Sequence, residues 1–82
     1  QLAVYDRYSW EYTAFPVENA VVLIENDRLA TALLRLSPKD REIFMMHWFL
    51  WMTDEQIAKC MGMARRTVNT RRYKAYRLLT KN

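Results

Sequence analysis

Residues 53–79, TDEQIAKCMGMARRTVNTRRYKAYRLL, decide the fold, because they have the pattern of two helices joined by a very short turn. Thr53, with Gln56 three residues later, has the form of a capping box, which starts a helix. Ala58 is small enough to let a second helix approach, and Gly62 tolerates the left-handed backbone of a tight turn. The apolar residues spaced to lock the two helices together are Ile57, Met61, Met63 and Val68. This combination predicts a helix-turn-helix.

The second helix is expected over about residues 65–80, and a helical wheel divides its side chains into two sets. With Val68 taken as the inner direction, Ala75 and Leu79 lie close to it. Outward-facing Arg and Asn can take guanine and adenine in a major groove, with later residues meeting phosphates. The predicted base-contacting residues are Arg65, Arg66, Asn69, Thr70 and Tyr73. The predicted phosphate-contacting residues are Arg71, Arg72, Lys74 and Arg77.

Charge is distributed unevenly along the 82 residues, whose net charge is +4. Residues 1–55 carry five basic and nine acidic side chains, whereas residues 56–82 carry eight basic and no acidic ones. Such a basic end attracts polyanions. A solvated tail is the alternative, but a disordered tail would not hold apolar residues at helical spacing. The asymmetry therefore favours double-stranded DNA as the partner.

Two further helices are expected upstream of the helix-turn-helix. Asn26 and Asp27 are good N-cap residues, and leucines at helical spacing predict a helix over residues 27–35. Ser37-Pro38 is a second start signal, with a capping hydroxyl and proline at the first helical position. The segment that follows, to about residue 50, is apolar nearly all round, which is typical of a central helix. Core filling is the main expectation for Trp48, Phe49, Trp51 and Met52, with some of them available for an exposed patch.

Residues 1–25 form a less regular N-terminal arm, and residues 26–82 form the predicted DNA-binding domain. The arm's β-branched and aromatic runs around Glu18-Asn19-Ala20 are consistent with a hairpin that has a three-residue loop. An extended arm, or a helix at residues 21–25, is the alternative. A lone hairpin is marginally stable, so it would lie on the helices or pair with a second copy as a homodimer.

The composition excludes several other classes of protein. The single His47 and single Cys60 leave no catalytic constellation, metal site or internal disulfide, and no Gly-rich loop is present to cradle a cofactor phosphate. We therefore expect a protein that is not an enzyme and needs no cofactor. No apolar run is long enough for a membrane span, and no signal peptide is visible, so a cytoplasmic protein is expected.

About residues 29–79 resemble region 4 of the sigma-70 family of RNA polymerase sigma factors. The matching positions are Leu36-Ser37-Pro38, Arg41-Glu42-Ile43-Phe44, Thr53, Glu55, Ile57, Ala58, Gly62, Arg65, Thr67-Val68, Ala75 and Leu78-Leu79. The chain is also similar to small sigma-like regulators of conjugative transposons and other bacterial mobile elements. The resemblance implies a four-helix domain whose last helix reads promoter DNA, while other surfaces bind the β-flap of RNA polymerase. It also implies a bacterial, nucleoid-associated protein, and it places Arg65, Arg66, Asn69 and Thr70 where family members contact bases.

The chain departs from the family pattern at three places. Ala64 stands where the family has a capping Ser or Thr, and Arg71 stands where an apolar residue is usual. Arg66 replaces a familiar Glu, which makes the usual promoter sequence an unsafe expectation. The stems of Arg71 and Arg72 are expected to run past the core toward phosphates.

These features predict an all-α, four-helix, sigma region 4-like helix-turn-helix domain with an irregular or β-hairpin N-terminal arm. Its expected function is sequence-specific DNA binding in transcription. Two alternatives remain: a module that docks on RNA polymerase or a regulator, and the DNA-binding tail of a recombinase.

Overall fold

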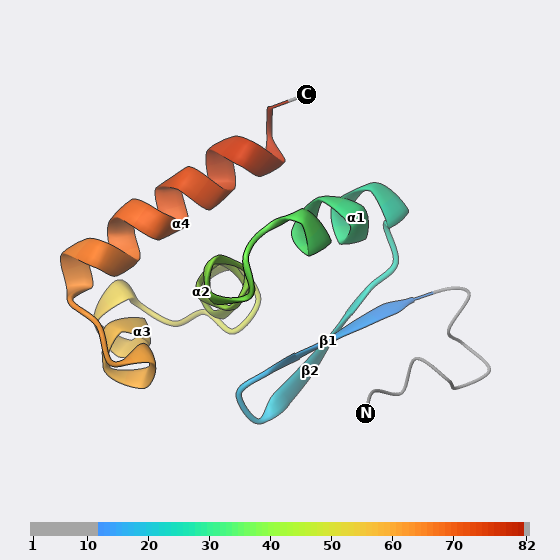
Figure 1. Ribbon diagram of the computed structural model, residues 1–82. Coiled ribbons are helices and arrows are strands. Elements are labelled where there is room, and N and C mark those ends of the chain that lie inside the picture. Colours follow the sequence, from blue (N-terminus) through green and yellow to red (C-terminus); the bar gives the residue numbers. More distant parts are fainter. Residues whose placement is uncertain (1–11, 82) are drawn as a thin grey trace. The chain divides into compact units, whose positions relative to one another are not determined.

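The computed structural model describes residues 12–81, which fall into two compact units. One unit ends at Arg35 and the other begins at Leu36. The described elements run in the order β1, β2, α1, α2, α3 and α4 (Figure 1). The part of the N-terminal arm expected over residues 1–11 lies outside the described residues.

The first unit contains the hairpin, formed by β1 (Thr13–Val17) and β2 (Ala20–Ile24). The strands are antiparallel, with Thr13 opposite Ile24 and Val17 opposite Ala20. Only residues 18 and 19 lie in the loop, and Glu18 has a φ of 55°, as two-residue hairpin turns require. The hairpin interpretation is confirmed with a shorter loop, and the alternative of a helix over residues 21–25 is wrong. An all-α class is therefore too narrow for this chain.

Helix α1 (Asp27–Arg35) completes the first unit and contacts β2. Asn26 caps it, since its Oδ1 accepts a hydrogen bond from the Leu29 N–H at 3.1 Å. The helix buries Ala30 and Leu33, which confirms the leucine spacing as the origin of its inner face. The sequence predicts a boundary between the arm and the DNA-binding domain after residue 25. The boundary between the two compact units lies after Arg35, because the first unit also includes Asn26 and α1.

The second unit begins with α2 (Pro38–Trp48), its central helix. The Ser37 hydroxyl accepts from the Asp40 N–H at 3.2 Å, with proline at the start of the helix, as the sequence predicts. Four consecutive residues, 43–46, are buried, so α2 contributes apolar side chains on most of its circumference. It contacts both helices that follow.

Helices α3 (Asp54–Met61) and α4 (Arg65–Leu79) form the predicted helix-turn-helix (Figure 1). The two side chains of α4 that are fully buried are Val68 and Ala75, as the wheel predicts. They meet a core to which α3 contributes Ile57 and Ala58. Complete burial of a valine or isoleucine side chain contributes roughly 1.5–3 kcal/mol each, so this small apolar interface sets where α4 lies.

Candidate nucleic-acid interface

The turn between α3 and α4 is short because one glycine reverses the chain. Gly62 has φ 67° and ψ 39°, and its N–H donates to the Ala58 carbonyl oxygen. A Cβ at this position would meet nothing within 4 Å, so the requirement for glycine comes from its backbone angles and not from crowding. The Met63 N–H also donates to the Ala58 oxygen, at 3.0 Å. The turn thus ends α3 and starts α4 within three residues.

Helix α4 begins without a side-chain cap. Ala64 has the extended backbone of an N-cap residue, φ −71° and ψ 148°, but no side chain that can accept a hydrogen bond. The first two helical residues, Arg65 and Arg66, are both exposed. The expected weak cap is confirmed, and the positive end of this helix carries positive side chains.

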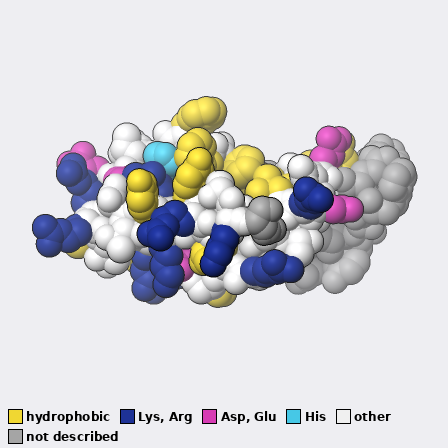
Figure 2. All heavy atoms as spheres, turned by 90° about the horizontal axis from the view of Figure 1, so that it is seen from above, with side chains coloured by type: hydrophobic (Ala, Val, Ile, Leu, Met, Phe, Trp, Pro, Cys, Tyr) yellow, Lys and Arg dark blue, Asp and Glu magenta, His cyan; other side chains and the backbone are white. Residues whose placement is uncertain are grey.

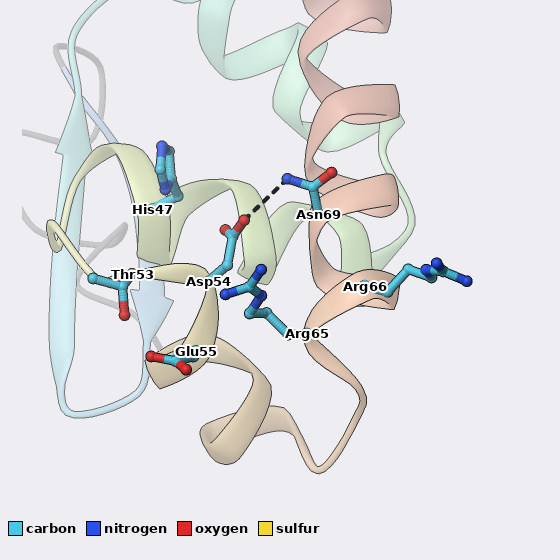
Figure 3. A pocket seen from close by; sticks show the side chains of 7 residues that line it. All are labelled: His47, Thr53, Asp54, Glu55, Arg65, Arg66 and Asn69. Atoms are coloured by element: carbon cyan, nitrogen blue, oxygen red, sulfur yellow. Dashed lines mark hydrogen bonds between the residues drawn. The ribbon is translucent and has the colours of Figure 1, made fainter.

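The five predicted base-contacting residues are all exposed on α4. Arg65, Arg66 and Asn69 line one recess of about 610 Å³ together with His47 from α2 and residues at the start of α3 (Figure 3). Thr70 lines a second recess of about 390 Å³, which Arg66 also borders. Tyr73 is 62% exposed and lines neither recess. The helix therefore presents a continuous polar face between two hollows.

The four predicted phosphate-contacting residues divide into two pairs. Lys74 and Arg77 are exposed. Arg71 and Arg72, in contrast, form ion pairs within the chain: Arg71 Nη1 lies 2.7 Å from Asp40 Oδ1, and Arg72 Nε lies 2.9 Å from Asp54 Oδ1. The Arg72 side chain is 18% exposed and that of Arg71 is 40% exposed. The expected phosphate contacts of these two arginines stay predictions, but the structure gives both a different neighbour.

The Asp54–Arg72 ion pair links α3 to α4. Arg72 donates from Nε to Oδ1 and from Nη2 to Oδ2, both at 2.9 Å, which is the two-pronged geometry that arginine favours with a carboxylate. Hydrogen bonds from Arg72 hold the pKa of Asp54 below the usual 3.8 of an aspartate, against an opposing effect of burial. The same bonds raise the pKa of Arg72. Both groups are therefore charged at neutral pH.

The sequence interpretation does not identify Asp40 and Asp54 as partners of α4. Both are near the start of a helix, where an acidic residue is favourable with any fold, so their presence alone carried no signal of a partner. The arginines follow 31 and 18 residues later, too far for helical or strand periodicity to connect them. The sequence offers one signal of these ion pairs. On the helical wheel, Arg71 and Arg72 lie beside the inner, apolar side of the helix, where arginine is unusual.

An aromatic surface adjoins the other end of α4. Trp48 stacks on Tyr76, with ring centroids 6.0 Å apart and planes 18° apart, and His47 forms a T-shaped pair with Trp48, with ring centroids 5.2 Å apart. Trp48 is 43% exposed and Trp51 is 83% exposed, so these two residues belong to the exposed patch that the sequence leaves open beside core filling. Figure 2 shows hydrophobic side chains beside the Lys and Arg side chains on the face seen from above. Besides Tyr73, the exposed aromatic side chains described in the second unit are Trp48, Trp51 and Tyr76; we call these three the aromatic surface.

His47 Nδ1 is buried and, among the described residues, has no hydrogen-bond partner. Within residues 12–81, no group of three His, Cys, Asp or Glu side chains is arranged to hold a metal ion. In the same range, no helix combines the length and the apolar character that crossing a bilayer demands.

A comparison with known protein families identifies the class to which this helix-turn-helix belongs. The model described as Sigma-70, region 4, matches residues 26–79, well over half of the chain. The chain therefore belongs to the sigma-70 region 4 family, a family of non-enzymatic helix-turn-helix domains that bind DNA in transcription initiation and interact with RNA polymerase. No curated protein and no solved structure matches the chain.

Proposed function

We propose that this domain binds double-stranded DNA with sequence preference by placing α4 in the major groove. The observation that carries the proposal is the outer face of α4, where exposed arginine, asparagine, threonine and lysine side chains follow one another over a buried Val68 and Ala75. Side chains near the N-terminus of such a helix reach base edges, and later ones reach the backbone.

We assign the proposed base and phosphate contacts according to how exposed each side chain is. Arg65, Arg66, Asn69, Thr70 and Tyr73 contact bases. Lys74 and Arg77, which lie further along α4, contact phosphates. Arg71 and Arg72 chiefly hold α4 against α2 and α3, with Arg71 exposed enough to reach a phosphate as well.

Selection of binding sites from random duplexes at two salt concentrations tests this proposal. Arg66→Ala and Asn69→Ala should relax base preference at separate positions, by roughly tenfold each. Lys74→Ala and Arg77→Ala should weaken binding to all duplexes alike and reduce the salt slope by about one each. Lys59→Ala, which removes an exposed cation from α3, is the charge-matched control and should leave preference unchanged. Equal losses for all four α4 variants, with preference intact, would contradict the groove assignment.

The aromatic surface supports a second function, docking on RNA polymerase. Exposed tryptophan and tyrosine are costly to leave in water and are enriched at the centres of protein interfaces. Trp51 is the most exposed member, and it adopts a left-handed backbone, φ 58°, which is unusual for a bulky residue. Trp51→Ala should reduce affinity for the polymerase core by about tenfold or more and leave affinity for DNA unchanged. Equal affinity of the variant and the unaltered protein for the polymerase would refute docking through this surface.

A further inference from the structure

Asp54 connects the first turn of α3 to two positions of α4, the exposed Asn69 and the mostly buried Arg72. Its Oδ1 accepts from Arg72 Nε, and its Oδ2 accepts both from Arg72 Nη2 and, at 3.1 Å, from Asn69 Nδ2. Asn69 and Arg72 are three residues apart and so lie next to each other on one side of the helix. The Asp54 carboxylate thus binds Arg72 and Asn69, a predicted base-contacting residue, at the same time.

The charge of Asp54 determines which atom of the Asn69 amide faces it. An ionised carboxylate has only acceptors, so the amide must turn its Nδ2 group toward Asp54. Arg72, bound at both carboxylate oxygens, favours the ionised form. The carbonyl oxygen Oδ1 is then directed elsewhere, and Figure 3 shows it pointing away from Asp54. An exposed asparagine without such a neighbour could turn its amide either way.

We propose that Asp54 is a positioning residue that presents Asn69 Oδ1 as an acceptor, so that Asn69 selects a base with an exocyclic amino group in the major groove. Adenine offers its N6 amine there and cytosine its N4 amine, whereas guanine and thymine offer only acceptors. This inference rests on the proposed binding of α4 in the major groove. It adds the class of base read at one position and the residue that imposes the choice.

The first test uses the unaltered protein and modified bases. Comparison of the unaltered protein with Asn69→Ala identifies the position in the DNA site at which base preference depends on Asn69. Adenine is then placed at that position in a synthetic duplex. Replacing that adenine by purine, which lacks the N6 amine, should lower affinity by about tenfold. Replacing it by 7-deazaadenine, which keeps the amine and lacks the N7 acceptor, should change affinity by no more than about twofold. Unchanged affinity with purine, or a larger loss with 7-deazaadenine than with purine, would show that Asn69 does not read the amine through Oδ1, and it would overturn the inference.

The second test changes Asp54 itself. Asp54→Asn introduces an amide that can donate as well as accept, so Asn69 can turn either way. The preference for adenine or cytosine should fall from about tenfold to about threefold or less, or reverse toward guanine or thymine, at that position alone. Glu55→Gln removes the same charge from the adjacent exposed residue and should leave the preference intact.

A third variant separates positioning from a looser attachment of α4. Arg72→Lys keeps a cation beside Asp54 but removes the two-pronged contact, and it should retain the preference at the Asn69 position. If Arg72→Lys loses the preference as fully as Asp54→Asn does, or if Asp54→Asn lowers affinity for every duplex without altering preference, Asp54 has a structural role only. If the unaltered protein prefers no base anywhere, the proposed DNA readout fails instead. An unchanged preference in Asp54→Asn overturns this inference alone.

Discussion

The starts of α3 and α4, at Asp54 and Arg65, are 11 residues apart in the chain, yet they are built in opposite ways. At the start of α3, the Gln56 N–H donates to Thr53 Oγ1 at 3.1 Å and the Thr53 N–H donates to Gln56 Oε1 at 2.9 Å. Two acidic residues follow at the positive end of the helix. At the start of α4, Ala64 supplies no cap and two arginines follow.

The difference indicates that the starts of α3 and α4 have different roles. The first is satisfied within the protein, because its N–H groups and its dipole find polar and acidic partners in the same chain. The start of α4 has neither a side-chain cap nor an acidic residue. Its open N–H groups and positive side chains are unfavourable in the isolated protein, and they become favourable beside an anion such as a phosphate group. The start of α3 is thus stabilised by the chain itself, whereas the start of α4 would be stabilised by an anionic partner.

The largest effect that tests this comparison is expected at Asp54. Asp54→Ala leaves the Arg72 guanidinium, 18% exposed, without its carboxylate, and should lower the free energy of unfolding by about 1–3 kcal/mol. Urea denaturation followed by circular dichroism measures the change. Glu55→Ala, the exposed neighbour, should change stability by less than about 0.5 kcal/mol. Equal effects of the two variants would mean that the ion pair adds nothing to the start of α3.

Loss of the capping box should have the next largest effect. Thr53→Ala removes the hydroxyl that accepts from the Gln56 N–H and should cost about 1 kcal/mol of unfolding free energy. Thr67→Ala, an exposed threonine within α4, is the matched control and should cost less. A result below about 0.3 kcal/mol for Thr53→Ala would show that this helix start is not a source of stability.

Adding the missing cap to α4 should act in the opposite direction and more weakly. Ala64→Ser should raise the unfolding free energy by about 0.5–1 kcal/mol, since a hydroxyl at this position can accept from the open N–H groups. Ala64→Asp should stabilise the protein as well, but should weaken DNA binding because its charge faces the phosphates. If Ala64→Asp binds DNA as tightly as the unaltered protein, the start of α4 does not lie near the DNA backbone.

The smallest expected effect is the change, with pH, in the stabilisation that Asp54 contributes. Because the pKa of folded Asp54 lies below the usual 3.8, the stabilisation from this group is fully present above that value. It is lost as the pH falls through the lowered pKa, where the folded state must take up a proton. The stability difference between the unaltered protein and Asp54→Asn should therefore be constant near neutrality and shrink in acid. A difference that grows in acid would contradict the lowered pKa.

What the sequence could predict was set by local chemistry. The capping box, the turn at Gly62 and the inner stripe of Val68 and Ala75 depend on residues within a few positions of one another, and all three are confirmed. The hairpin was one of several readings, because a short strand pattern does not distinguish a pair from an extended arm. Its loop is one residue shorter than expected.

What the sequence could not predict depends on residues far apart. The partners Asp40 and Asp54 are joined to α4 only by the fold, so the charge count of the last 27 residues overstated how much positive charge is available to DNA. Composition cannot distinguish a buried tryptophan from an exposed one, so the sequence does not show which of Trp48, Phe49, Trp51 and Met52 form the exposed patch.

The two ion pairs of adjacent arginines also fix the rotational setting of α4 about its own axis. Arg71 and Arg72 project about 100° apart around the helix, one toward Asp40 on α2 and the other toward Asp54 on α3. Rotation in one direction would stretch the first contact, and rotation in the other would stretch the second. A helix held in this way offers one set of side chains to its partner at a constant angle, as reading a fixed register of base pairs demands.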